Sequence, residues 1–360
     1  RRTALPHRAA FVAADAPALV QALRAYASGG TASAEGVAPD SGRARVAFVA
    51  PGQGAQWNGM GRELMAREPV FRAALEACDR AARPWIEWSI VEQLALDPGQ
   101  SGHLLDRIDV IQPVLVALAI AYAELLRSKG IEPDALVGHS MGEVAAARLA
   151  GAIDLDSAMR IICRRSALMA RGAGRGAMAL VELTPEEAAA RLAGLENRVC
   201  VAGNNSPRGS VISGEPEAVG RVLAGLEADG VFARRVKVDV ASHSPQMEPH
   251  AAELRRELAG LAPRATRVAF HSTVLGRHAE GAELGEDYWA RNLRQPVLFG
   301  GTTRAMIDEG TTVFVELGPH PVLSPSIQQT AQAASREVNA IACGRRDEPE
   351  AATLLAAVAG

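Results

Sequence analysis

The run Gly-His-Ser-Met-Gly at residues 138–142 is the best candidate in this sequence for covalent chemistry. It follows a short apolar segment, 135–137, which predicts a strand, and precedes an alanine-rich segment, 143–150, which predicts a helix. A serine between two glycines at such a sharp turn exposes its hydroxyl at the sheet edge, near the positive end of the next helix. Ser140 is therefore a candidate nucleophile that can form an ester with an acyl group.

A serine nucleophile needs a base, and His243 is the best placed of the eight histidines. Residues 236–240 alternate like a strand, and Ser244-Pro245 is typical of a helix N-cap followed by proline at the first helical position. His243 is thus expected at the carboxyl end of a strand, where open α/β sheets gather their ligands.

Arg165 is a cation expected at the edge of a buried helix face. The helix is predicted to begin with Asp154 as its N-cap, and Arg164 points the opposite way. A guanidinium in this position needs a carboxylate partner, which is either a protein side chain or an acidic substrate. The residues alone leave open a structural ion pair, a snorkelling side chain and a substrate site.

The elements around these residues predict an α/β fold with a parallel sheet. Strands are expected at 46–50, 135–137, 268–272 and 312–317, with a glycine-rich turn at 51–54 and helices at 113–129 and 245–260. Between 176 and 237 the expected order is strand 177–181, helix 185–195, strands 198–202 and 210–213, helix 217–228 and strand 233–240. The order β-α-β-β-α-β is the signature of a ferredoxin-like unit, here inserted in the larger sheet domain.

The composition indicates an intracellular, soluble protein. The 360 residues are 48% hydrophobic and 22% charged, with a net charge of −3, which gives no indication of nucleic-acid binding. The longest apolar run, 111–126, is expected to be too short for a membrane span, and no signal peptide is visible. The four cysteines lack metal-ligand spacing, so no metal site is expected and a cytoplasmic location is predicted. The start without Met predicts an excised fragment.

Several motifs in this order resemble the malonyl-CoA:acyl carrier protein transacylase family, and in particular the acyltransferase domains of modular type I polyketide synthases. They are Pro-Gly-Gln-Gly-Ala-Gln at 51–56, Gly-His-Ser-Met-Gly-Glu at 138–143, Arg-Ser at 165–166, Ala-Ser-His-Ser at 241–244 and Asn-Leu-Arg-Gln-Pro-Val at 292–297. The resemblance implies an α/β-hydrolase-like large subdomain at 43–175 and 238–343, and a ferredoxin-like small subdomain at 176–237. It also implies a ketosynthase-to-acyltransferase linker remnant at 1–42, containing a helix near 16–27, and a post-acyltransferase linker at 344–360.

The same resemblance implies a role for each site residue. Ser140 would accept the acyl group and His243 would be its base, oriented by a backbone carbonyl that maps to Asn292. Arg165 would pair with the free carboxylate of the extender unit. The backbone N–H groups of Gln53 and Met141 would form the oxyanion hole.

These roles make a ping-pong acyl transfer without a permanently bound cofactor. An acyl-CoA would acylate the serine, and the phosphopantetheine thiol of an acyl carrier protein would then take the acyl group. The implied neighbour in the parent chain is a ketosynthase domain, and the isolated fragment is expected to be a monomer.

The resemblance favours methylmalonyl as the extender, with malonyl or another substituted unit as the alternative. Phenylalanine at the position of Ser242 is associated with malonyl, and the small serine leaves room for an α-methyl group. Met141 and the segment 107–112, which ends in Gln112, also follow the methylmalonyl pattern. Val240 stands where tyrosine is typical of that pattern.

Two functions of other classes remain as alternatives. An α/β-hydrolase such as a thioesterase would use Ser140 with an acid and a late histidine, for which His320 is the candidate. A scaffold domain would have the same fold with an inactive site. Labelled acyl-CoA separates the three, because a transferase keeps the label, a hydrolase releases free acid and a scaffold takes none.

Overall fold

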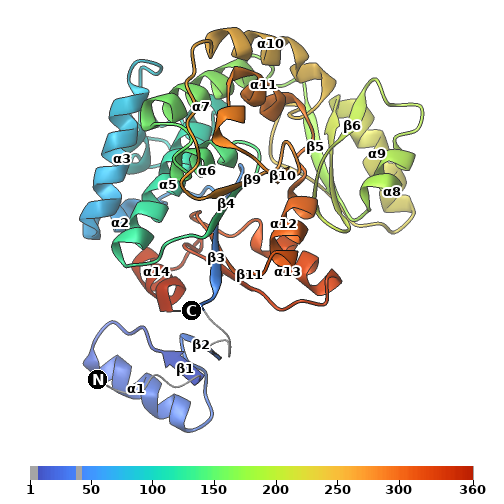
Figure 1. The fold of residues 1–360 in the computed structure, drawn as a ribbon. Coiled ribbons are helices and arrows are strands. Elements are labelled where there is room, and N and C mark those ends of the chain that lie inside the picture. Colours follow the sequence, from blue (N-terminus) through green and yellow to red (C-terminus); the bar gives the residue numbers. More distant parts are fainter. Residues whose placement is uncertain (1–6, 38–42, 360) are drawn as a thin grey trace.

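The larger subdomain is built around a mainly parallel sheet. The computed structural model describes residues 7–37 and 43–359, and within them this sheet has six strands in the order β10-β9-β4-β3-β11-β12 (Figure 1). Neighbouring strands are parallel except for the short edge strand β10, which is antiparallel to β9. The strands are β3 (Arg45–Ala50), β4 (Ala135–Gly138), β9 (Ala269–Ser272), β10 (Arg277–His278), β11 (Thr311–Glu316) and β12 (Asn339–Ala342). The predicted α/β fold with a parallel sheet is confirmed.

The two faces of the sheet bury different cores, because side chains alternate along each strand. Phe48 and Leu136 belong to the larger hydrophobic cluster, whereas Val49 and Val137 belong to the second one. The first face is covered by α3 (Pro69–Ala82), α5 (Ile108–Ser128), α6 (Gly142–Leu149) and α7 (Leu155–Ala170), and the second by α12 (Phe299–Asp308) and α13 (Ser324–Ala333) (Figure 1). Burial on both faces is typical of parallel strands.

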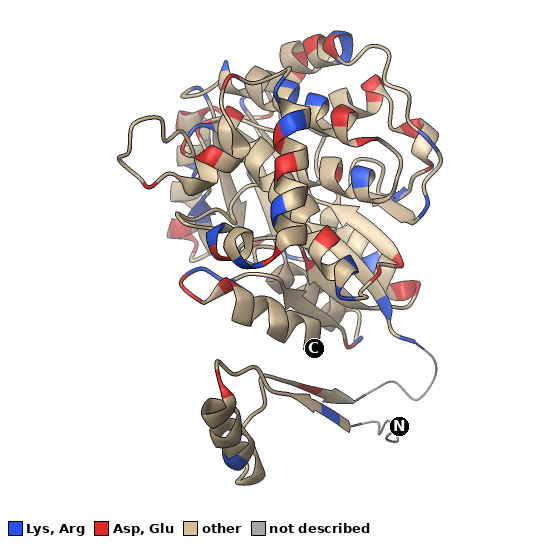
Figure 2. Ribbon diagram, turned by 90° about the vertical axis from the view of Figure 1, so that its left-hand side faces the viewer, with Lys and Arg blue, Asp and Glu red and all other residues tan. Residues whose placement is uncertain are grey.

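Shorter or outer helices complete this subdomain. They are α2 (Arg62–Arg67), α4 (Ile90–Ala95), α10 (Glu248–Glu257) and α11 (Glu286–Arg294), with the single 3₁₀ turns η1 (Pro245–Met247) and η2 (Gly281–Glu283). The helix expected at 245–260 is thus a 3₁₀ turn followed by α10. Figure 2 shows acidic and basic residues mixed along the outer helices. An ion pair between Arg171 and Glu253, 2.9 Å apart, joins the end of α7 to α10.

Helix α5 is longer than the sequence predicted. It begins at Ile108 rather than Pro113, because the burial of Ile108 and Ile111 outweighs the one backbone hydrogen bond that Pro113 cannot donate. Its 21 residues are long and apolar enough to cross a membrane, so the expectation of a run too short for that was wrong. In the structure, 89% of its apolar window is buried inside the protein, as in the core helix of a globular fold.

The small subdomain is an antiparallel sheet with two helices. Its order, β6-β7-β5-β8, is that of a ferredoxin-like unit, in which the first and third strands lie in the middle. The elements are β5 (Ala177–Val181), α8 (Pro185–Arg191), β6 (Val199–Ser206), β7 (Gly209–Gly214), α9 (Pro216–Ala228) and β8 (Ala233–Arg235). β8 stops five residues before the predicted end at 240, because the chain turns at Val236 and Val238 and returns to the larger subdomain, where Val240 is buried.

Both ends of the described chain contain regular secondary structure. β1 (His7–Ala10) and β2 (Ala34–Val37) form an antiparallel pair that accompanies α1 (Ala16–Ala27), at the bottom of Figure 1. Of the predicted linker remnant at 1–42, residues 1–6 and 38–42 lie outside the described part. At the other end, α14 (Glu350–Ala359) packs on α2, and the Glu350 carboxylate accepts hydrogen bonds from the amides of Gly61 and Glu63 at 2.5 and 3.0 Å.

Candidate active site

Ser140 lies in a strained turn between β4 and α6. Its φ is +53°, in the left-handed region that residues with side chains rarely adopt. The turn requires glycine on both sides, because a Cβ on Gly138 would overlap the Glu143 nitrogen and one on Gly142 would overlap the Ala50 carbonyl oxygen. The two glycines therefore allow the backbone to fold closely enough to place the serine hydroxyl at the end of the sheet.

His243 faces this hydroxyl from the segment that returns from the small subdomain. Its Nε2 lies 2.7 Å from Ser140 Oγ, and its own φ is also positive, at +58°. Its Nδ1 lies 2.9 Å from the backbone carbonyl of Gln295. A carbonyl only accepts hydrogen bonds, so Nδ1 carries the proton and Nε2 is free to accept one from the serine. The structure thus brings together the predicted nucleophile and base.

The carbonyl that orients His243 belongs to Gln295, so its assignment to Asn292 was wrong. Asn292 lies inside α11, whereas Gln295 follows the helix with an extended backbone, ψ +157°, and its carbonyl turns toward the imidazole. Sequence reasoning missed Gln295, although it is part of the motif at 292–297. The helix end at Arg294, just before the Gln-Pro dipeptide, was the signal that could have found it.

Burial keeps His243 neutral. Burial and, to a smaller extent, the positive charge of Arg165 lower the pKa of the imidazole from 6.5 to about 3, although the hydrogen bond that Nδ1 donates to the Gln295 carbonyl acts in the opposite direction. A neutral imidazole at physiological pH is the form that can act as a base.

Arg165 is fully buried and points at the nucleophile. Its Nη2 donates to Ser140 Oγ at 3.0 Å, and its Nη1 donates to Gln112 Oε1 at 2.9 Å. Its Nε donates to Asn292 Oδ1 at 3.1 Å. Within the described residues, no carboxylate forms an ion pair with this guanidinium, which distinguishes it from Arg164, paired with Glu257 at the surface. The structural ion pair considered for Arg165 is therefore not formed.

A buried carboxylate, Glu143, supports the site from behind, and sequence reasoning gave it no role. It accepts hydrogen bonds from Tyr288 at 2.7 Å, from Asn292 Nδ2 at 2.9 Å, and from the amide and hydroxyl of Thr273 at 2.6 and 3.1 Å. Burial raises its pKa, and these donors oppose the rise. Asn292 Nδ2 also donates to the Ser140 carbonyl at 3.0 Å, so the network holds the nucleophile turn itself.

Two backbone amides are available where an oxyanion hole is expected. In the described part of the chain, neither the Gln53 amide nor the Met141 amide donates to a protein acceptor. The loop of Gln53 lies against the nucleophile turn, since a Cβ on Gly52 would come within 2.9 Å of His139 Nδ1. The Gln53 side chain accepts from Gln112 Nε2 at 3.2 Å, which ties the loop to α5. The Met141 amide comes just before α6, at its positive end.

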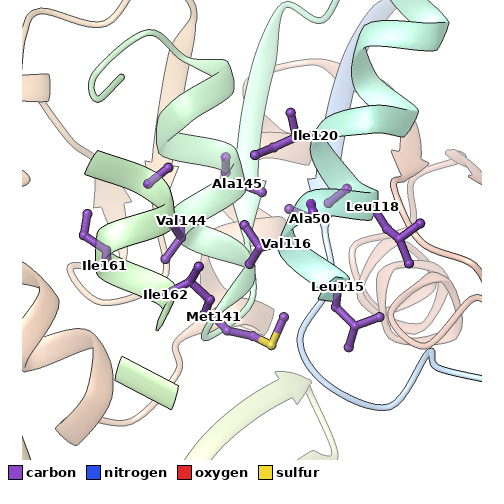
Figure 3. Packing of buried hydrophobic residues seen from close by; sticks show 14 of the residues in the cluster. Ala50, Leu115, Val116, Leu118, Ile120, Met141, Val144, Ala145, Ile161 and Ile162 are labelled. Carbon is purple, nitrogen blue, oxygen red and sulfur yellow. The ribbon is translucent and has the colours of Figure 1, made fainter. Parts of the chain in front are cut away.

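The residues expected to set specificity are all buried. Ser242 and Gln112 are mostly buried next to His243 and Arg165 respectively. The Met141 side chain lies in the hydrophobic cluster with Val144 and Ile162 (Figure 3). Val240, which stands where the methylmalonyl pattern has tyrosine, is fully buried and packs in the same cluster.

A groove of about 650 Å³ runs between the two subdomains. Phe232, Arg208 and Arg234 line it from the small subdomain, and Val322 and Gln329 from α13 and the loop before it. Its lining includes Ser206, the neighbour of Asn205, whose Oδ1 lies 2.8 Å from His139 Nε2 in the nucleophile turn. The Cγ1 of Val322 also comes within 3.8 Å of a Cβ built on Gly54, beside Gln53. In the part of the chain that the structure describes, none of the residues predicted for the site lines this groove.

His320 does not take part in this site. Its Nδ1 accepts from the amide of Arg346 at 3.2 Å, in a turn between β11 and α13, and the base opposite Ser140 is His243. The late histidine of the thioesterase alternative is therefore not placed to act. Among the described residues, no three His, Cys, Asp or Glu side chains group as metal ligands would.

The chain is similar in sequence to one family throughout its length. Residues 47–359 match the family model described as acyl transferase domain. Over 360 residues the chain is 44% identical to the spectinabilin polyketide synthase system protein NorA of Streptomyces orinoci, an alignment that includes 99% of this chain and 19% of NorA. The chain thus spans under a fifth of that relative's length.

Solved structures show the same fold. The acyltransferase domain from module 8 of the salinomycin polyketide synthase aligns with a TM-score of 0.91 and 39% identity, over 97% of this chain and 82% of that one. A malonyl-transacylase solved in complex with its type II acyl-carrier protein aligns with a TM-score of 0.77 and 27% identity, over 87% and 99% of the chains.

Proposed function

Because the chain belongs to the family of acyltransferase domains of modular type I polyketide synthases, we propose that it transfers a methylmalonyl group from coenzyme A to the phosphopantetheine thiol of an acyl carrier protein. The carrier protein and a neighbouring ketosynthase domain would be its partners in the parent chain.

The observation that carries this proposal is the position of Arg165. Its guanidinium donates to the nucleophile at 3.0 Å and has no carboxylate partner among the described residues. An acyl group esterified to Ser140 places any carboxylate at its far end within reach of that cation. Guanidinium recognises carboxylate through both geometry and charge, so the site selects dicarboxylic acyl groups over simple ones.

Acylation of the serine follows from the hydrogen bonds around it. His243 Nε2 takes the proton of Ser140 as Oγ attacks the thioester carbonyl, while the Gln295 carbonyl holds the imidazole in place. The amides of Gln53 and Met141 donate to the developing oxyanion. When the C–S bond breaks, the imidazolium gives its proton to the coenzyme A thiolate, and the acyl-serine remains.

The second half-reaction repeats these steps with a new nucleophile. The phosphopantetheine thiol gives its proton to His243 and attacks the ester, and the C–O bond breaks as Ser140 regains the proton.

The choice of methylmalonyl is supported by the small residue before the base. Ser242 immediately precedes His243 and offers a hydroxymethyl group where an aromatic ring would fill the space beside the imidazole. A methyl group in a pocket changes binding by about 1–3 kcal/mol, so this residue can decide between malonyl and methylmalonyl. Malonyl or a larger extender is the alternative outcome of the test.

The test is the mass of the protein after exposure to a mixture of malonyl-, methylmalonyl-, ethylmalonyl- and propionyl-CoA. We expect a stable methylmalonyl adduct on wild type and on Ser335→Ala, a matched control that removes another positive-φ serine outside the site. We expect no adduct on Ser140→Ala, and acylation slowed by about 10²- to 10⁴-fold in His243→Ala. Rapid release of free acid would instead indicate a thioesterase, and a wild type without any acyl adduct would indicate a scaffold.

A further inference from the structure

A buried chain of hydrogen bonds connects the substrate-facing cation to a carboxylate. Arg165 Nε donates to Asn292 Oδ1 at 3.1 Å, and Asn292 Nδ2 donates to Glu143 Oε2 at 2.9 Å. All three side chains are buried, and they come from α7, α11 and α6. One neutral amide therefore stands between a buried cation and a buried anion.

The orientation of this amide is fixed by its neighbours. Arg165 has only donors, so the Asn292 atom beside it must be the oxygen. Glu143 and the Ser140 carbonyl are acceptors, so the atom facing them must be the nitrogen, which donates to both at 2.9 and 3.0 Å. No other natural side chain of this size presents an acceptor on one side and two donors on the other without a charge.

The spacing of the charges has a consequence for substrate binding. An isolated buried cation is costly, and Glu143 offsets part of that cost from one side chain away. Burial lowers the pKa of Arg165 to about 10, and the charge of Glu143 opposes this, so the guanidinium stays protonated at neutral pH. A carboxylate in direct contact with the guanidinium would instead satisfy it and compete with an acidic substrate.

We propose that Asn292 is a specificity-determining positioning residue, which aims Arg165 at Ser140 while keeping the Glu143 carboxylate out of contact with the guanidinium. The charge of Arg165 is thereby left for the carboxylate of the incoming acyl group. This inference rests on the proposed function, since it assigns that charge to an acidic substrate.

The experiment compares acylation of the full chain by methylmalonyl-CoA and propionyl-CoA, which differ by one carboxylate. Asn292→Asp puts a carboxylate on Arg165 at almost unchanged volume. We expect the ratio of kcat/KM for methylmalonyl over propionyl to fall about 10- to 100-fold, mainly through KM, as for the loss of a hydrogen bond to a charged group. Asn339→Asp, which adds the same charge at an exposed position in β12, should keep the wild-type ratio.

A second variant covers the case in which two adjacent carboxylates prevent folding. In Asn292→Asp with Glu143→Gln the net charge is restored, and the new amide can donate to Asp at 292 and to the Tyr288 hydroxyl, which then donates to Ser272 Oγ. We expect thermal stability to recover in part, because the Ser140 carbonyl still lacks the donor that Asn292 Nδ2 supplied, while the substrate ratio stays low. A merely structural role for Asn292 predicts recovery of both, which overturns the proposal.

Repeating the Asn292→Asp substitution in the Arg165→Ala protein tests whether Asn292 acts on the substrate ratio through the guanidinium. There, Asn292→Asp should leave the already low ratio unchanged, and a further fall contradicts the proposal. A wild type that acylates equally well from both thioesters overturns the proposed function itself. If the wild type prefers methylmalonyl-CoA and the variant with both Asn292→Asp and Glu143→Gln prefers it equally, only the role proposed for Asn292 is overturned.

Discussion

The neutral state of His243 makes a prediction about stability and pH. The unfolded chain binds a proton on this imidazole below about pH 6.5, whereas burial lowers the folded pKa to about 3. Between these values the unfolded state binds more protons than the folded state. The contribution of this group to the free energy of unfolding is therefore complete above about pH 6.5 and is lost as the pH falls.

The size of the effect follows from the two pKa values. pH 5 lies about 1.5 units below the pKa of the unfolded imidazole, which is therefore protonated, whereas the folded imidazole is still neutral. The free energy of unfolding is therefore lower by about 2 kcal/mol at pH 5 than at pH 8. His243→Asn removes this titration, and asparagine is a residue that tolerates the positive φ of this position. The substitution lowers stability at every pH through lost packing, but its cost should shrink by about 2 kcal/mol from pH 8 to pH 5.

Urea denaturation of both proteins at several pH values measures this difference. His278→Gln, which removes an exposed imidazole on β10, is the control and should follow the wild type. Other buried groups titrate in both proteins and cancel in the comparison. A difference between wild type and His243→Asn that does not change with pH would refute the reasoning, because it requires the same proton uptake by folded and unfolded His243.

Three sets of substitutions, at Arg165, at Ser242 with Val240, and at Glu350, test other parts of the structure. Arg165→Lys should acylate more slowly from methylmalonyl-CoA, because an ammonium cannot form the guanidinium fork, and Arg165→Ala should raise the relative use of propionyl-CoA in a competition assay. Ser242→Phe with Val240→His should shift the preference toward malonyl-CoA by about ten- to two-hundred-fold in the same assay, with a loss of overall rate. Glu350→Gln should lower the free energy of unfolding by about 1–3 kcal/mol in urea denaturation, because the amide turns a donor toward the backbone N–H groups that begin α2. An unchanged substrate preference contradicts the prediction for Ser242→Phe with Val240→His, and an unchanged urea midpoint contradicts the prediction for Glu350→Gln.

The sequence predicted the order of the elements because periodicity reports burial. The alternation of the small subdomain gave its β-α-β-β-α-β order, and the observed sheet has the matching arrangement. The errors lie where tertiary contacts override local signals. Pro113 was read as a helix start, although the buried residues before it continue α5, and β2, a strand of four residues, was not predicted. The cytoplasmic location, the domain boundaries and the monomeric state stay predictions.

The site was predictable where a residue stands at the end of a strand or beside a turn. Ser140 and His243 have such signals, and the structure places them 2.7 Å apart across 103 residues of sequence. The partners of these residues were not predictable in the same way. Whether Asn292 or Gln295 orients the imidazole depends on where α11 ends and how the chain leaves it, which is a matter of one turn of helix.

The backbone at the two reacting residues explains why the network behind them is needed. Four non-glycine residues in the described ranges have positive φ, and Ser140 and His243 are two of them. Each such residue costs of order 1–3 kcal/mol, so surrounding contacts must hold the strained conformations in place. Glu143 is suited to this, because its four hydrogen bonds join α6 to the end of β9 and to α11, and Asn292 carries the connection to the Ser140 carbonyl. The same two residues thus hold the nucleophile turn and space the charges around the cation, which couples the strain at the serine to the recognition of the acyl group.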